Sequence, residues 1–310
     1  MMNIVIYGSG GVGGYFGSRL LQAGNNVHFI ARGAHLEALK NHGIHVYSIL
    51  GDVHISDLRV SSSSSEIAFD QIDLVIFATK TYQLQEAAYE IKPYVKSNTT
   101  VLSLLNGISN ASILSEVFGP EQVLGGLCRI ISKIDSPGII RHIDVKPSIV
   151  FGELDGALTL RAEAIYEVFK SAGIKTQLTE NIHREIWTKF MFISSISALG
   201  ALVRVPIGIL RVGYLRNLII STAEEIKNLG ELHGINFPED IILKQLEVID
   251  KQDALTTASL QRDIMEGRRS ELEAQNGEVV RLCKEKNISC PTNEMIYELL
   301  RPQELKNQNK

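Results

Sequence analysis

The chain has 310 residues, of which 45% are hydrophobic and 21% charged, and its formal net charge is −4. This composition is typical of a globular protein, and the length suffices for about two domains of roughly 100–200 residues each. The small negative charge gives no reason to expect nucleic acid or an anionic membrane as a partner.

Histidine and cysteine usage argues against a metal centre or a disulfide framework. The eight histidines are scattered and show no H-x-E or H-E-x-x-H spacing, so we expect no metal site. Cys128, Cys283 and Cys290 form no C-x-x-C pair, which predicts reduced thiols and a cytoplasmic protein. The N-terminus lacks the basic segment of a signal peptide. The apolar stretch from Phe190 to Val203 is short for a bilayer span and predicts a buried core helix.

The N-terminal residues predict a dinucleotide-binding turn. A short apolar strand ending at Tyr7 runs into G-x-G-x-x-G, and a helical pattern follows from Gly14 to Ala23. Gly8 allows the tight turn, Gly10 lets the backbone approach a pyrophosphate, and Gly13 lets helix and strand pack closely. The free N–H groups of the helix would face that pyrophosphate. The cofactor-binding residues predicted in this turn are Gly8, Gly10, Gly11, Val12 and Gly13.

Strand and helix patterns then alternate along the chain. Strands are predicted at residues 26–30, 72–78 and 101–105, with a β excursion over 44–60, and helices at 33–40 and 82–94. This alternation predicts a right-handed, doubly wound parallel sheet. The serine tract Ser61–Ser65 predicts a solvated loop.

The pattern changes twice in the rest of the chain. Three β segments are predicted within residues 123–151, followed by a helix over 157–171 and a last strand at 174–178. From Asn181 onward only helical patterns remain, broken at glycine and proline. We therefore expect an NADP-binding Rossmann-type domain over residues 1–180 and an all-α substrate and catalytic domain over 181–310. The substrate is expected between them, at the carboxyl ends of the strands.

Three polar residues follow predicted strands. Arg32 stands where NAD-binding folds usually carry an acidic residue, and an arginine there suits the 2′-phosphate of NADP, although a solvated arginine is the alternative. Lys80 either adds a second positive charge near the adenine side or is an ordinary loop lysine. Asn106 either hydrogen-bonds the nicotinamide carboxamide or the substrate, or simply forms an Asn-Gly turn.

Two ionisable residues of the helical half are candidates for chemistry. Lys189 lies in an apolar segment whose burial would lower its pKa toward that of a general acid, but Glu185 one turn earlier offers a plain ion pair. Ser270 to Glu273 has the pattern of a capping box. Glu271 would then lie in the first helical turn, either with a role at the site or only as a carboxylate favoured by the helix dipole.

Together these motifs resemble the ketopantoate reductase (2-dehydropantoate 2-reductase) family. They lie in order along the whole chain: Gly8-x-Gly10-x-x-Gly13 with Arg32, Ala78-Thr79-Lys80, Leu105-Asn106-Gly107, Trp187-x-Lys189 and Ser270-Glu271-x-x-x-Asn276-Gly277. The resemblance implies a Rossmann domain followed by a helical domain. It also implies an NADP-dependent oxidoreductase that reduces 2-dehydropantoate to (R)-pantoate in pantothenate biosynthesis.

The resemblance further implies roles for individual residues. Lys189 matches the catalytic lysine that protonates the carbonyl oxygen as hydride arrives. Glu271 matches the carboxylate that binds the substrate hydroxyl, and Ser259 matches a serine that contacts the substrate carboxylate. Asn106 matches an asparagine at the nicotinamide and substrate.

The cofactor end follows the family, whereas the substrate end departs from it. Arg32 and Lys80 match the pair that holds the 2′-phosphate. The best-known members carry substrate-facing asparagines where this chain has Ile193 and Ser197, so these two residues are expected to line the substrate-binding site. The substrate is therefore open between 2-dehydropantoate and another small 2-oxo acid. The alternative functions are another two-domain hydroxyacid dehydrogenase and a non-catalytic NADP sensor. The sequence leaves a homodimer open.

Overall fold

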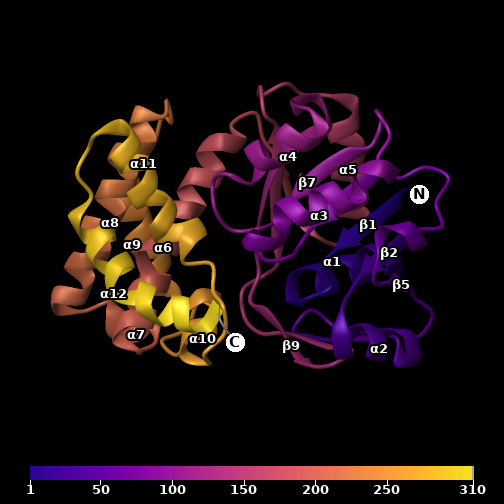
Figure 1. The fold of residues 1–310 in the computed structure, drawn as a ribbon, viewed down its shortest axis with the longest axis horizontal. Helices are drawn as coiled ribbons and strands as arrows, with labels where there is room; N and C mark the ends of the chain where they lie inside the picture. The colour runs from indigo at the N-terminus through magenta and orange to yellow at the C-terminus, as the bar shows by residue number, and fades with distance from the viewer. Residues whose placement is uncertain (309–310) are drawn as a thin grey trace. The chain divides into compact units, whose positions relative to one another are not determined.

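The computed structural model describes residues 1–308, which form two compact units (Figure 1). The first unit comprises Met1–Leu105 and Ser109–Ile182. The second comprises the chain from His183 onward together with the short segment Asn106–Ile108, which follows a strand of the first unit. The chain therefore contributes to the helical unit from two separate places in the sequence.

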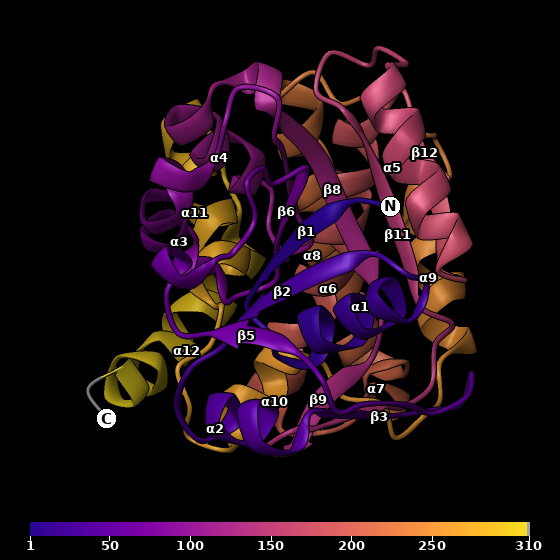
Figure 2. The same cartoon turned by 90° about the vertical axis from the view of Figure 1, so that its right-hand side faces the viewer.

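The first unit is built around an eight-stranded sheet (Figure 2). Its strands are β1 (Asn3–Tyr7), β2 (Asn26–Ile30), β5 (Arg59–Ser61), β6 (Leu74–Phe77), β7 (Thr100–Ser103), β8 (Val123–Arg129), β11 (Ser148–Glu153) and β12 (Lys175–Leu178). Their order is β12-β11-β8-β7-β6-β1-β2-β5, and all neighbours from β5 to β8 are parallel. That part has the 3-2-1-4-5-6 order of dinucleotide-binding folds. β11 is antiparallel to β8, so β11 and β12 run against the other strands.

Helices cover both faces of this sheet because its central strands are apolar on both sides. In β1, Ile4 and Ile6 belong to one core cluster, and Val5 and Tyr7 belong to another on the opposite face. The first cluster includes side chains of α1 (Gly11–Gln22), α2 (Gly33–His42) and α5 (Leu160–Ser171), and the second includes α3 (Leu84–Ile91) and α4 (Asn110–Phe118). The predicted doubly wound α/β architecture is thus confirmed.

A second, four-stranded sheet packs against α1. It consists of β3 (Ile44–Ser48), β4 (Val53–Ile55), β9 (Ser132–Ser136) and β10 (Ile139–His142), in the order β4-β3-β10-β9. A Cβ added to Gly14 of α1 would lie 2.8 Å from the Ile140 side chain, so the helix and this sheet are in close contact. The β segments were predicted, but their pairing across about ninety residues was not, because nothing local in either segment specifies its partner.

Several sequence-based expectations need correction. α1 begins at Gly11 rather than Gly14, and α4 has no counterpart among the predicted elements. The serine tract is not a wholly solvated loop, since Ser61 ends β5 and Ser64 begins a short 3-10 helix, and both are buried. Their polar groups have protein partners, which removes the need for water.

The 3-10 helices of this unit are η1 (Ser64–Glu66), η2 (Thr81–Gln83), η3 (Lys92–Tyr94) and η4 (Pro120–Gln122).

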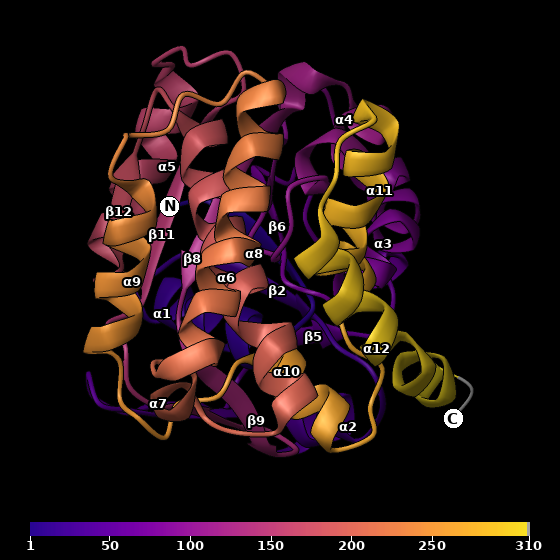
Figure 3. The same cartoon turned by 90° about the vertical axis from the view of Figure 1, so that its left-hand side faces the viewer.

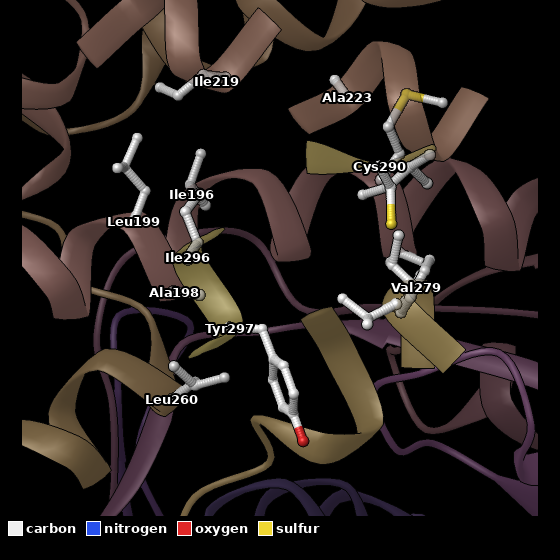
Figure 4. Packing of buried hydrophobic residues seen from close by; sticks show 14 of the residues in the cluster. Ile196, Ala198, Leu199, Ile219, Ala223, Leu260, Val279, Cys290, Ile296 and Tyr297 are labelled. Carbon is white, nitrogen blue, oxygen red and sulfur yellow. The ribbon is translucent and has the colours of Figure 1, made fainter. Parts of the chain in front are cut away.

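The second unit is helical throughout its described residues (Figure 3). Its elements are α6 (Ile182–Val203), α7 (Ile207–Leu210), α8 (Gly213–Leu232), α9 (Ile241–Lys251), α10 (Ser259–Met265), the π-helical turn η5 (Glu273–Gly277), α11 (Glu278–Lys286) and α12 (Pro291–Gln308). Although α6 is long and apolar enough to cross a membrane, most of it is buried in the core. Figure 4 shows Ile196 and Leu199 of α6 among the residues of that core. The prediction of a buried core helix is confirmed.

All three cysteines are buried and unbridged, as predicted. Burial raises the pKa of the Cys283 and Cys290 thiols, so neither has the thiolate character of a reactive cysteine. Residues 1–308 contain no group of histidine, cysteine and acidic side chains able to hold a metal ion.

Candidate active site

The glycine turn between β1 and α1 has a different constraint at each glycine. Gly8 has φ +100°, and a Cβ there would lie 2.8 Å from the backbone of Ala78 and Thr79. A Cβ on Gly13 would overlap the carbonyl oxygen of Gly8 and press on Ile6. A Cβ on Gly10, in contrast, would meet nothing within 4 Å. Gly8 and Gly13 are therefore required by the protein's own packing, whereas Gly10 borders open space.

The open space lies at the N-terminus of α1. Gly10 is the N-cap residue and has no side chain with which to cap the helix, and the first turn carries no acidic side chain. An α-helix leaves its first N–H groups without intrahelical acceptors, so those at Gly11 and Val12 are donors suited to an anion. The Ser132 carbonyl oxygen would lie 2.7 Å from a Cβ on Gly11, and the buried Ser132 hydroxyl has no partner among the described residues. These residues fit a dinucleotide pyrophosphate.

His35, on α2, fixes the same turn from the other side. Its Nδ1 accepts from the Gly138 N–H at 3.0 Å, and its Nε2 therefore donates to the Ser9 carbonyl oxygen, also at 3.0 Å. Burial lowers the pKa of His35, which keeps the ring neutral and this tautomer in place. Neither His35 nor Ser132 was predicted, because no motif marks either residue.

Arg32 and Lys80 follow the two strands that flank β1. Arg32 is the N-cap residue of α2, and its half-exposed guanidinium forms an ion pair with Glu90 of α3 at 3.3 Å. Lys80 precedes η2, and its backbone N–H donates to Gln83 Oε1 at 3.3 Å. Both residues thus lie at the carboxyl edge of the sheet, on opposite sides of the glycine turn. Glu90 was not predicted as a partner of Arg32.

Lys189 lies on α6 and is half-buried. Its neighbours Trp187 and Phe190 belong to the core of the helical unit. Ile193 and Ser197 follow at intervals of four residues, which places all three on one side of the helix over about 12 Å. Ile193 is half-buried, whereas Ser197 is fully buried.

Ser197 makes a buried hydrogen bond within the helical unit. Its hydroxyl donates to Gln275 Oε1 of η5 at 2.6 Å, and Gln275 is itself fully buried. Next to it, Asn276 Nδ2 donates to the Ser194 carbonyl oxygen at 3.3 Å and to Asn293 Oδ1 at 3.0 Å. These bonds hold the π-helical turn on α6, so the Ser197 hydroxyl is used inside the protein. No motif or local pattern marks Gln275.

The predicted capping box at Ser270 is wrong. The Ser270 hydroxyl donates to Glu304 Oε2 of α12 at 2.6 Å and accepts from the Leu272 N–H at 3.2 Å. Glu273 accepts from the Tyr297 hydroxyl at 2.9 Å instead of reaching back to Ser270. A carboxylate from a distant helix thus takes the place of the local capping partner. Glu271, between these residues, is buried before the helical turn begins.

Ser259 and Asn106 both belong to the helical unit. Ser259 is the first residue of α10 and is half-buried. Asn106 is half-buried and precedes Gly107, whose φ of +100° is that of a glycine turn. Asn106 groups with the helical unit that also contains Lys189, Glu271 and Ser259.

This fold and turn define the class of two-unit proteins that join a dinucleotide-binding domain to a helical domain. Residues 4–156 match the family model described as ketopantoate reductase PanE/ApbA, and residues 181–304 match the model of its C-terminal domain. The chain belongs to the ketopantoate reductase family and is an oxidoreductase of that family.

Similar proteins span the whole chain. The "uncharacterized oxidoreductase YkpB" of Bacillus subtilis is 30% identical, with 96% of this chain and 97% of that protein covered. The solved 2-dehydropantoate 2-reductase of Geobacter metallireducens is 28% identical with a TM-score of 0.90, covering 96% and 99% of the two chains. A D-mandelate dehydrogenase solved with NADH and anilino(oxo)acetate has the same fold, with a TM-score of 0.91, 24% identity and coverage of 99% and 100%.

Proposed function

We propose that this chain is an NADPH-dependent reductase that converts 2-dehydropantoate to (R)-pantoate. The observation that carries the proposal is Lys189, which stands half-buried between the buried Trp187 and Phe190 in a member of a reductase family. A lysine in such surroundings is suited to general acid catalysis at a carbonyl. Membership of the family supports the reaction type, and the name of the Geobacter relative supports the substrate.

The reduced dinucleotide, when bound, supplies a hydride to the carbonyl carbon. Lys189 donates the proton that the carbonyl oxygen takes up, and its positive charge stabilises the negative charge that develops there. Glu271 binds the substrate hydroxyl, Ser259 the carboxylate, and Asn106 the nicotinamide or the carbonyl. The glycine turn and the N-terminus of α1 hold the pyrophosphate.

NADPH is favoured over NADH in this proposal by Arg32. The residue at this position sets the charge next to the adenosine ribose, and a guanidinium suits a 2′-phosphate. Lys80 adds a second cation at the same edge of the sheet. We propose that residues 1–180 bind the cofactor and that residues 181–310 bind the substrate and carry the catalytic lysine, with Asn106 as the exception.

A second candidate substrate is another 2-oxo acid. Ile193 and the buried Ser197 remove polar groups where the family resemblance expects substrate-facing amides. The D-mandelate dehydrogenase that shares the fold was solved with NADH and anilino(oxo)acetate. A larger or more apolar 2-oxo acid would suit the half-buried Ile193.

Steady-state oxidation of NADPH tests these alternatives. We expect the highest kcat/KM with 2-dehydropantoate when it is compared with pyruvate, 2-oxoisovalerate and phenylglyoxylate. A clear preference for one of the others would transfer the proposal to that acid. Tight NADPH binding without oxidation by any of them would favour a non-catalytic sensor. Sedimentation of the same preparation checks for a homodimer, and a cytoplasmic location belongs to the same proposal.

A further inference from the structure

The Arg32–Glu90 ion pair is part of a fixed network at the ribose end of the predicted cofactor site. Glu90 Oε2 accepts from the Tyr7 hydroxyl at 2.5 Å and from Arg32 Nη2 at 3.3 Å. Glu90 Oε1 accepts from the Ser64 N–H at 3.1 Å and from the Ser64 hydroxyl at 3.4 Å. Both carboxylate oxygens are therefore held by groups from other elements.

The partners of Glu90 are themselves rigid. Tyr7 is the last residue of β1 and is buried in the core on the α3 face, where its ring stacks on Phe77 at 5.5 Å. Ser64 is fully buried at the start of η1. Arg32 is the exception, because about half of its side chain is exposed to solvent. The carboxylate is consequently fixed from the protein side, while the guanidinium that it binds is half-exposed and accessible to a ligand.

Glu90 carries a negative charge at neutral pH. Burial alone would raise its pKa, but the hydrogen bonds from Tyr7 and Ser64 and the charge of Arg32 outweigh burial and lower the pKa. Burial and the bond to Glu90 raise the pKa of Tyr7, which keeps the phenol a donor. A permanent anion thus stands beside the cation that the sequence predicts for a 2′-phosphate.

We propose that Glu90 is a specificity-determining residue for the dinucleotide. Its carboxylate competes with a 2′-phosphate for Arg32 and so reduces the ratio of NADPH affinity to NADH affinity. This inference rests on the proposed function only in requiring that a dinucleotide binds at the glycine turn. In folds of this type an acidic residue at the end of the second strand binds the ribose 2′-hydroxyl. Here α3 supplies a carboxylate to the same edge, beside the arginine that replaces that residue.

This competition predicts the direction in which the affinity for each dinucleotide changes. A 2′-phosphate approaching Arg32 meets the like charge of Glu90, whereas a 2′-hydroxyl carries no charge and can donate to a carboxylate. Removal of the Glu90 charge should therefore strengthen NADPH binding and leave NADH binding unchanged or weaker. The ratio of the two dissociation constants isolates this effect from any general change in the site.

The test is direct titration of the free protein with each dinucleotide, followed by fluorescence of the bound nicotinamide. We expect Glu90→Gln to raise the NADPH-to-NADH affinity ratio by roughly fivefold or more. Glutamine keeps one acceptor oxygen for the Ser64 N–H, and its amide NH2 can donate to the Tyr7 hydroxyl oxygen, so the fold should persist, and a thermal melt checks this. Glu90→Ala provides a second removal of the charge and should change the ratio in the same direction.

Glu86→Gln is the matched control. Glu86 lies one turn earlier on α3, is exposed, and carries the same charge. This variant should leave the affinity ratio at the wild-type value. An unchanged or lower ratio in both folded Glu90 variants would overturn the proposal. Failure of the wild-type protein to bind either dinucleotide would instead contradict the proposed function, so the two failures are distinguishable.

Discussion

Gly10 provides a test of where the cofactor lies that leaves the fold untouched. Its φ of −67° and ψ of −161° are extended backbone, and an added Cβ would meet nothing within 4 Å. Replacement of glycine by alanine at such a position stabilises a protein by about 0.4–1 kcal/mol, through the unfolded chain. For a unit of this size that corresponds to a rise in Tm of at most about 2–4 °C.

Although Gly10→Ala should slightly stabilise the fold, it should weaken cofactor binding. If a pyrophosphate fills the space above Gly10, the new methyl group overpacks it, and overpacking costs about 1–3 kcal/mol. The dissociation constant for NADPH should therefore rise by roughly 5- to 150-fold. Titration of the free protein gives this constant, and calorimetry of the same sample gives Tm.

Gly13→Ala is the contrasting variant. Its Cβ would overlap the main-chain oxygen of Gly8, which cannot move without distorting β1 and the turn. This variant should lower Tm before any ligand is added. Unaltered NADPH affinity in a folded Gly10→Ala protein would refute the reasoning, because the open space at the α1 N-terminus would then not hold the phosphates.

Three further predictions concern the catalytic lysine, the buried hydroxyl and acid stability. Lys189→Ala should lower kcat/KM by about 10²–10⁴-fold without changing the NADPH dissociation constant, since a general acid contributes on that scale; near-native turnover would exclude this role. Ser197→Ala leaves Gln275 Oε1 buried without its donor and should cost about 1–3 kcal/mol in denaturant unfolding, with KM nearly constant; a large rise in KM at unchanged stability would restore Ser197 as a substrate ligand. Burial lowers the pKa of His28 to about 4, so its neutral form is favoured in the fold, and this contribution to stability is present above pH 6.5 and lost as pH falls toward 4. Relative to His28→Gln, the wild type should lose about 2 kcal/mol between pH 8 and pH 5, and parallel stability curves would contradict the assignment.

The elements set by local pattern were predictable from the sequence. The second strand, residues 26–30, is predicted to the residue, because an apolar run is bounded there by turn residues. The helical half follows from the loss of strand patterns after Asn181. The role of Gly13 follows from the motif because its close contacts include Gly8 and Ile6 of the same βα unit. The contact of Gly8 with the backbone of Ala78 and Thr79, after β6, lies outside that unit.

The failures share a dependence on distant contacts. The Ser270 capping box fails because Glu304, on another helix, binds the hydroxyl that a local glutamate was expected to share. Ser64 is buried because Glu90 lies above it, although a run of serines predicts a solvated loop. The pairing of Gln275 with Ser197 joins residues 78 positions apart, which no periodicity reveals. The motifs identify the candidate residues of the site, whereas tertiary contacts determine which of their hydrogen-bonding atoms remain available to a ligand.

The segment Asn106–Ile108 has a consequence for how the two units can be separated. Because these residues group with the helical unit while their flanking chain belongs to the sheet unit, the backbone passes between the units at three places rather than one. Ile108 packs against the core of the helical unit. A fragment beginning at residue 181 would lack that side chain and leave a gap in its own core. The two units are therefore not interchangeable modules, and an exchange of helical domains between relatives would have to carry the loop after β7 with it.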